Sequence, residues 1–329
     1  SSSTNSGKTV KSLDSHLPRV VPRLLVGSGV LALLATTLVG PAVAQEEALS
    51  PRNANYTISV ALDPESRTLA GSQVLTWTNI QQQPTRELWF HLYWNGWRND
   101  RSTWMTEDRI RGRSSNRDPR PGDWSSLEID SAHLLAGEGW EATDLMPTFR
   151  FVSPDDQNRH DRTVAVLTLP REVQPGESVQ VEMDWRAKIP RTFARTGFRG
   201  DFYFIAHWFP KLGVFEGDGW NCHQYHSATE YFSDYGVYDV TITLPEEFVI
   251  GATGRQIEDR NNGDGTRTHR FEQADVHAFT WTASPDYLVE VERFEEDGLP
   301  PVDIRLLYQP EHRSQVQRHF DATKAALKY

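Results

Sequence analysis

The residues best suited to chemistry gather in one segment of the 329-residue chain, GDGWNCHQYHSATEYFSDYG at positions 217–236. On a helix, two histidines and a glutamate in this segment would face the same way, because they are three and four residues apart. The flanking residues alternate as strands and loops, however, and outside a helix this spacing does not bring ligands together. Three interpretations therefore stay open: a structural aromatic loop, the lining of a ligand cleft, and a metal site. The side chains of metal-binding type are Cys222, His223, His226, Glu230 and Asp234.

Motifs of known catalytic centres are absent from the sequence. It contains no H-E-x-x-H zinc helix, no G-x-S-x-G nucleophile elbow, no Walker loop and no dinucleotide fingerprint. His160, Asp161 and His269 occur among polar residues, and we expect them to be solvated. We therefore predict neither a catalytic residue nor a metal ligand within this chain.

The composition excludes some classes of function. The formal net charge of −11 and the lack of a basic cluster argue against binding to nucleic acid. The single cysteine, Cys222, excludes an internal disulfide. The 11 Trp and 10 Tyr residues suit either packing in large sheets or a surface that binds carbohydrate or peptide, and we favour packing.

The elements that must position the 217–236 segment are predicted to be strands. Apolar and polar residues alternate in NYTISVAL (55–62) and in VQVEMDWRA (179–187), as in half-buried strands. Similar segments recur up to about Gly298, with a long irregular region at residues 95–160. We expect an all-β unit over 55–298, with no helix longer than two turns outside 96–160.

The first 44 residues resemble a secretory signal. Arg19 and Arg23 precede an apolar run at 24–39, and small residues at 42–44 offer a cleavage site before Gln45. We expect residues 20–44 to be helical and the protein to be periplasmic or secreted. Cleavage is favoured over a retained membrane anchor, which is the alternative.

The character of the chain changes near Leu299. After a Pro-Pro linker, residues 302–308 predict a strand and residues 312–329 predict a helix, so a second, α-containing domain is expected to begin here. No stop signal follows Tyr329 and the chain opens on Ser1 rather than Met, so we interpret it as a fragment. The side chains expected to line one face of the helix are Val316, Phe320, Thr323 and Leu327.

Six segments, in this order, resemble the N-terminal domain of the aminopeptidase N family of zinc metallopeptidases, and most closely its bacterial exported branch. The resemblance covers roughly residues 55–329, with a gap over 96–160. No segment is diagnostic alone, but six in the right order are together fairly specific. They are YTISVALDPESRTLAGSQVLTWTN, LWFHLYWN, VLTLPREVQPGESVQVEMDWRAKIP, HWFPKLGVFEGDGWN, YDVTITLPEEFVIGATG and ADVHAFTWTASPDYL.

In that family a large, saddle-like β-sandwich domain precedes a thermolysin-like catalytic domain, which opens with a strand and a helix. The resemblance thus implies a signal peptide at 1–44, a linker at 45–54, a β domain at 55–298 and the start of the catalytic domain at 299–329. It also implies that the zinc ligands lie downstream, that the whole protein removes N-terminal residues from peptides, and that this chain alone is inactive.

The resemblance also implies a substrate-binding residue. In the family, a Gln or Glu of the β domain reaches the active-site cleft shortly before the strand that matches YDVTITLP. The usual Q-C-E pattern is not kept here, which leaves the choice open between Gln224, nearest by spacing, and Glu230, the acidic alternative.

Two other functions are alternatives to a zinc aminopeptidase. One is a non-catalytic relative that binds peptides or partners because its downstream domain has lost the zinc ligands. The other is an unrelated exported β-sandwich that binds carbohydrate through a row of surface tryptophans.

Overall fold

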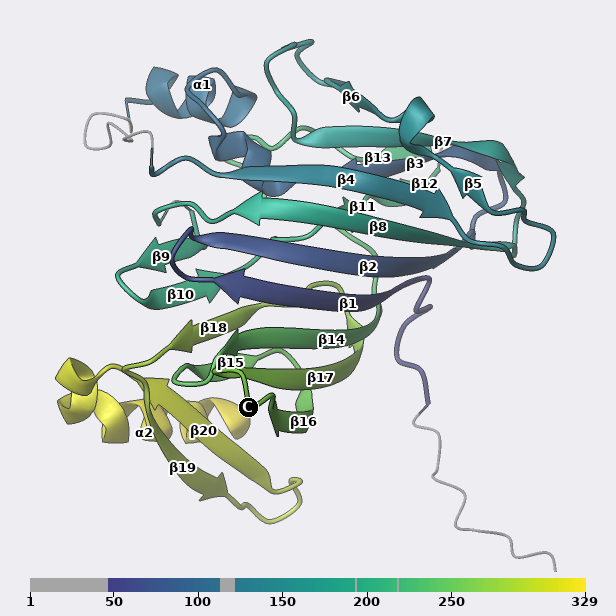
Figure 1. The fold of residues 1–329 in the computed structure, drawn as a ribbon. Coiled ribbons are helices and arrows are strands. Elements are labelled where there is room, and N and C mark those ends of the chain that lie inside the picture. The colour runs from purple at the N-terminus through teal and green to yellow at the C-terminus, as the bar shows by residue number, and fades with distance from the viewer. Residues whose placement is uncertain (1–46, 113–121, 193, 218) are drawn as a thin grey trace, which may run out of the picture. The chain divides into compact units, whose positions relative to one another are not determined.

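The computed structural model describes residues 47–112, 122–192, 194–217 and 219–329. Strands hold 48% of the residues, and the largest sheet of the described part has eight strands (Figure 1). Its strand order is β16 (Arg255–Asn261), β17 (Thr266–Val276), β14 (Gly236–Pro245), β1 (Ala54–Asp63), β2 (Thr68–Thr78), β8 (Ser178–Lys188), β4 (Ser126–Leu134) and β5 (Thr143–Asp144).

Smaller sheets accompany the eight-stranded one. One four-stranded sheet has the order β15 (Val249–Ala252), β18 (Trp281–Ser284), β10 (Phe202–Ile205) and β9 (Gly197–Arg199). The other has the order β11 (Lys211–Leu212), β3 (Thr85–His91), β7 (Val164–Val173) and β6 (Arg150–Val152). Two hairpins complete the set: β12 (Val214–Glu216) with β13 (Gly219–Asn221), and β19 (Leu288–Phe294) with β20 (Val302–Tyr308).

Helices are short in the described part of the chain. The expected absence of a helix longer than two turns holds for the described residues of 55–298 outside 96–160. None of the described helices is long and apolar enough to cross a membrane, and the predicted helix at 20–44 lies outside the described residues. The helices are α1 (Thr103–Ile110), α2 (Val316–Leu327) and the 3-10 turns η1 (Tyr93–Trp97), η3 (Met146–Thr148) and η4 (Pro310–Gln315).

Alternating side chains explain why the large sheet forms. On β1 and β8 every second residue is buried, so each strand has one apolar face against the core and one polar face. The predicted fold class, an all-β sandwich with several sheets followed by a helix, is confirmed. The buried residues of these two strands are Ala54, Tyr56, Ile58, Val60 and Leu62, and Val179, Val181, Met183, Trp185 and Ala187.

The pairing of β1 with β14 is parallel and joins two distant parts of the sequence. Tyr56 lies opposite Tyr238 in this ladder, and their rings stack with centroids 4.9 Å apart. At the start of β14, a Cβ on Gly236 would lie 1.7 Å from the carbonyl oxygen of Ala54. Only glycine therefore lets the two backbones approach this closely. This ladder fixes where the segment before β14 enters the sheet.

Tryptophan side chains fill the core rather than the surface. All 11 Trp residues are within the described part, and none is exposed. The favoured interpretation, packing in the sheets, is thus confirmed for the tryptophans, and they form no row on the surface. The buried tryptophans are Trp77, Trp94, Trp97, Trp104, Trp140, Trp185, Trp208 and Trp281.

The predicted C-terminal strand and helix are β20 and α2 (Figure 1). β20 pairs with β19, so the predicted boundary at 298/299 falls in the turn of a hairpin. Val316 and Phe320 of α2 are buried against this hairpin, as the helical stripe predicts. Thr323 and Leu327 are exposed instead, because only the first turns of α2 lie over the apolar residues of β20.

Candidate functional site

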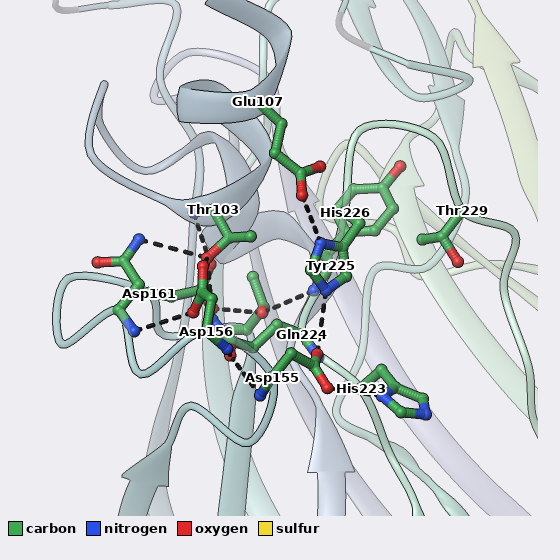
Figure 2. A network of polar contacts seen from close by, with 12 residues as sticks. Thr103, Glu107, Asp155, Asp156, Asp161, His223, Gln224, Tyr225, His226 and Thr229 are labelled. Atoms are coloured by element: carbon green, nitrogen blue, oxygen red, sulfur yellow. Dashed lines mark hydrogen bonds and ion pairs between the residues drawn. The ribbon is translucent and has the colours of Figure 1, made fainter. Parts of the chain in front are cut away.

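The segment singled out by its chemistry lies in an irregular stretch, residues 222–235, between β13 and β14. It contains neither strand nor helix, so hydrogen bonds from its side chains to neighbouring elements must hold it. Two such elements are α1 and the 153–163 loop between β6 and β7 (Figure 2).

A buried aspartate joins these two elements. The carboxylate of Asp161 accepts hydrogen bonds from the backbone N–H of Thr103 at 3.0 Å and of Thr163 at 2.8 Å. Its position at the N-terminus of α1 complements the free N–H groups and the dipole there. The prediction that Asp161 is solvated is wrong, because the side chain is only 1% exposed.

His269 is the second correction to the predicted solvated residues. It lies on β17 and is 4% exposed, and its Nδ1 is 3.0 Å from the Nε2 atom of Gln256. Strand pairing with β14 and β16 turns this residue inward, which the polar sequence around it does not reveal. Burial lowers the pKa of His269.

Gln224, one of the two candidates for the substrate-binding residue, lies inside the protein and is 1% exposed. Its Oε1 accepts a hydrogen bond from the N–H of Asp155 at 3.1 Å, and its Nε2 donates to Oγ1 of Thr103 at 2.9 Å. Its own N–H donates to Oδ2 of Asp155 at 2.7 Å. The amide thus joins α1, the 153–163 loop and the 222–235 segment.

His226 and His223 form a series of polar contacts with two carboxylates. Nδ1 of His226 is 2.7 Å from Oε1 of Glu107 on α1, and Nε2 is 3.0 Å from Oδ2 of Asp155. Nδ1 of His223 is 2.7 Å from the other oxygen of Asp155. Figure 2 shows the His226 ring between Glu107 and Asp155.

The groups in this series shift one another's pKa values. Burial alone would lower the pKa of His226, but hydrogen bonds to Glu107 and Asp155 outweigh burial and raise it above the ordinary 6.5. Burial would likewise raise the pKa of Asp155 and of Glu107, but the hydrogen bonds they accept lower both. The arrangement therefore favours an imidazolium between two carboxylates.

Glu230, the other candidate, lies on the surface. Its carboxylate accepts two hydrogen bonds from the guanidinium of Arg195, at 2.7 and 2.9 Å, and these bonds lower its pKa. The two side chains are 73% and 64% exposed, so Glu230 can meet a ligand from solvent. The adjacent Tyr231 is partly buried, and its hydroxyl is 2.6 Å from that of Tyr225.

The remaining residues of metal-binding type point elsewhere. Cys222 is 2% exposed, and burial raises the pKa of its thiol. Asp234 is partly buried, which raises the pKa of its carboxyl. Among the described residues, no group of three or more His, Cys, Asp or Glu side chains is arranged to hold a metal ion. Three ring nitrogens of His223 and His226 approach carboxylates, and each contacts a different oxygen atom.

Sequence reasoning did not find Glu107, Asp155 or Arg195. The first two lie in the region interpreted as irregular, and each is about 70 residues or more from its histidine partner. Arg195 pairs with Glu230 from a loop of the chain that carries no motif. A local signal existed only for α1, whose N-cap Ser102 accepts a hydrogen bond from the N–H of Met105.

Comparisons with known proteins give structural neighbours only. No family model matches this chain, and no curated protein matches it. An M1 zinc metallopeptidase from Deinococcus radiodurans is similar at 14% identity and a TM-score of 0.46, over 79% of this chain and 49% of that chain. A mutant of that enzyme bound to a Tyr-Ser-Ala substrate is similar at 15% identity and a TM-score of 0.46, with the same coverage. This chain spans about half the length of those structures.

Proposed function

We propose that this chain is the N-terminal part of a zinc-dependent aminopeptidase, in which the β-sheet unit positions a peptide and a following domain supplies the zinc. The observation that carries the proposal is the ordered set of six segments that resemble the aminopeptidase N family. They occupy core strands of the structure, among them β1, β2, β3 and β14. The non-catalytic relative and the carbohydrate-binding sandwich are the outcomes that a failed test would favour.

Zinc has no ligand set among the residues that the structure describes. The ring nitrogens of His226 are both directed at carboxylates, so binding a metal there would break these ion pairs. Zinc bound downstream would polarise the scissile carbonyl and activate a water molecule. The part left to this chain is to bind and orient the substrate.

Glu230 is better placed than Gln224 to face a substrate. An exposed carboxylate can accept hydrogen bonds from the free α-ammonium group of a peptide. Its present partner, Arg195, is also exposed, and exposed ion pairs contribute little stability, so a substrate can displace it. Gln224, in contrast, has both ends of its amide in use and holds the segment in place.

Aminopeptidase kinetics of the complete gene product test this assignment. We expect Glu230→Ala to lower kcat/KM by about tenfold or more while leaving the melting temperature nearly unchanged. Gln224→Ala should mainly lower the free energy of unfolding, by about 1–3 kcal/mol, because it removes the acceptor of the Asp155 N–H and the donor to Oγ1 of buried Thr103.

The matched control is Asp130→Ala. Asp130 also accepts two hydrogen bonds from an exposed arginine, Arg186, but on the polar face of the large sheet. Equal losses of kcat/KM in Glu230→Ala and Asp130→Ala would show that Glu230 has no special relation to substrate.

We also propose that the protein is exported, with its leader removed. The support is the positive start, apolar run and small residues of positions 19–44. N-terminal sequencing of the protein from the producing cells should begin at or near Gln45. A mature chain that still contains Arg19 would contradict cleavage and favour the membrane anchor.

A further inference from the structure

His226, like Gln224, ties the 222–235 segment to two other parts of the protein. It contacts Glu107 of α1 with one ring nitrogen and Asp155 of the 153–163 loop with the other. The next residue repeats the connection, because the N–H of Ser227 donates to Oε2 of Glu107 at 2.9 Å. The segment has no regular secondary structure, so such bonds hold it together with the packing of Tyr225 and Tyr231 against the core.

The geometry suits only one protonation state of the ring. Ionised carboxylates accept hydrogen bonds but cannot donate them, and a neutral imidazole has a single N–H. With carboxylate oxygens at 2.7 and 3.0 Å from its two nitrogens, a neutral His226 would direct a lone pair at one of them. Both carboxylates also accept backbone N–H groups, from Ser227 and Gln224, which favours their ionised form.

We propose that His226 is a pH-sensitive clasp: its imidazolium form joins α1 to the 153–163 loop, and loss of the proton loosens the part of the segment that follows Gln224 and Tyr225. The titratable groups around it are Glu107 on α1 and Arg111 just after its end, Asp155 and Asp156 from the loop, and His223 from its own segment. Because Glu230 lies in the loosened part of the segment, the clasp would regulate substrate binding. This consequence rests on the proposed function, whereas the clasp itself does not.

The sign of the pH dependence follows from the raised pKa of His226. A group whose pKa is higher in the folded state than in the unfolded state stabilises the folded protein. This contribution is complete when the pH is below the unfolded-state pKa, here 6.5. That contribution is lost as the pH rises through the folded value, which lies above 6.5. The clasp is therefore closed below about pH 6.5 and opens as the pH rises through the folded-state pKa of His226.

Nuclear magnetic resonance of the chain tests the clasp directly. We expect the His226 ring to titrate above its ordinary range, and the amide protection factors of residues 226–231 to fall about tenfold or more through the same transition. In His226→Gln, which carries no charge at any pH, these protection factors should no longer change across this range. Glu107→Gln should lower the pKa of His226, whereas Asp108→Asn, which removes a charge from the next position of α1, should not.

Three results would overturn the clasp: a His226 ring that titrates at or below its ordinary value, protection of 226–231 that does not change with pH, or the same transition in His226→Gln. None of these measurements needs peptidase activity. An inactive gene product would therefore refute the proposed function without contradicting the clasp. A His226 ring that fails these tests would refute the clasp without contradicting the proposed function.

Discussion

Replacing Lys211 with methionine is expected to stabilise the protein by roughly 2–4 kcal/mol near neutral pH, because it removes a buried charge. Lys211 is 1% exposed, and its ammonium donates a hydrogen bond to the carbonyl oxygen of His277 at 3.1 Å. No carboxylate among the described residues lies within ion-pair distance of it. Burial lowers its pKa from 10.5 to about 7.

The predicted stabilisation depends on pH in a defined direction. Between pH 7 and 10.5 the unfolded chain keeps the Lys211 proton that the folded chain has lost, so the stability of the native protein rises with pH. The methionine variant should lack this rise. The difference between the two proteins should therefore be largest at or below about pH 7 and shrink towards pH 10.5.

Chemical denaturation at several pH values measures this difference. The carbonyl of His277 keeps another donor in the variant, because it also accepts a hydrogen bond from the hydroxyl of Ser233 at 2.8 Å. The matched control is Lys328→Met, at an exposed lysine that pairs with Glu296, where a change within about 0.5 kcal/mol is expected. A loss of stability in Lys211→Met that is equal at all pH values would show that the amine is needed for packing and carries no charge penalty.

Much of the fold could be predicted because a strand with one buried face shows alternating apolar and polar residues in its own sequence. Tyr56, Ile58 and Val60 alternate with polar residues, and all three are buried as expected. The parallel pairing of Tyr56 with Tyr238 could not be predicted in this way, because nothing near either residue specifies so distant a partner. The burial of Lys211 could not be predicted either, because lysine side chains are almost never fully buried without a partner.

Only some residues of the candidate site could be predicted from the sequence. His223, His226 and Glu230 stand close together in the chain, and their residue types alone drew attention to them. What they do depends on Glu107, Asp155 and Arg195, which tertiary contacts bring from elsewhere. With these partners, the residues of metal-binding type form ion pairs. Gln224 is buried beside them, whereas Glu230 is exposed.

Zinc content of the complete gene product, measured by mass spectrometry beside that of this chain alone, tests the central claim most directly. We expect about one zinc per molecule in the complete product, together with release of N-terminal residues that a chelator abolishes. This chain alone should hold no stoichiometric zinc and cleave no peptide. Stoichiometric zinc in this chain, lost on replacing His223 and His226 with alanine, or a complete product with neither zinc nor aminopeptidase activity, would contradict the account.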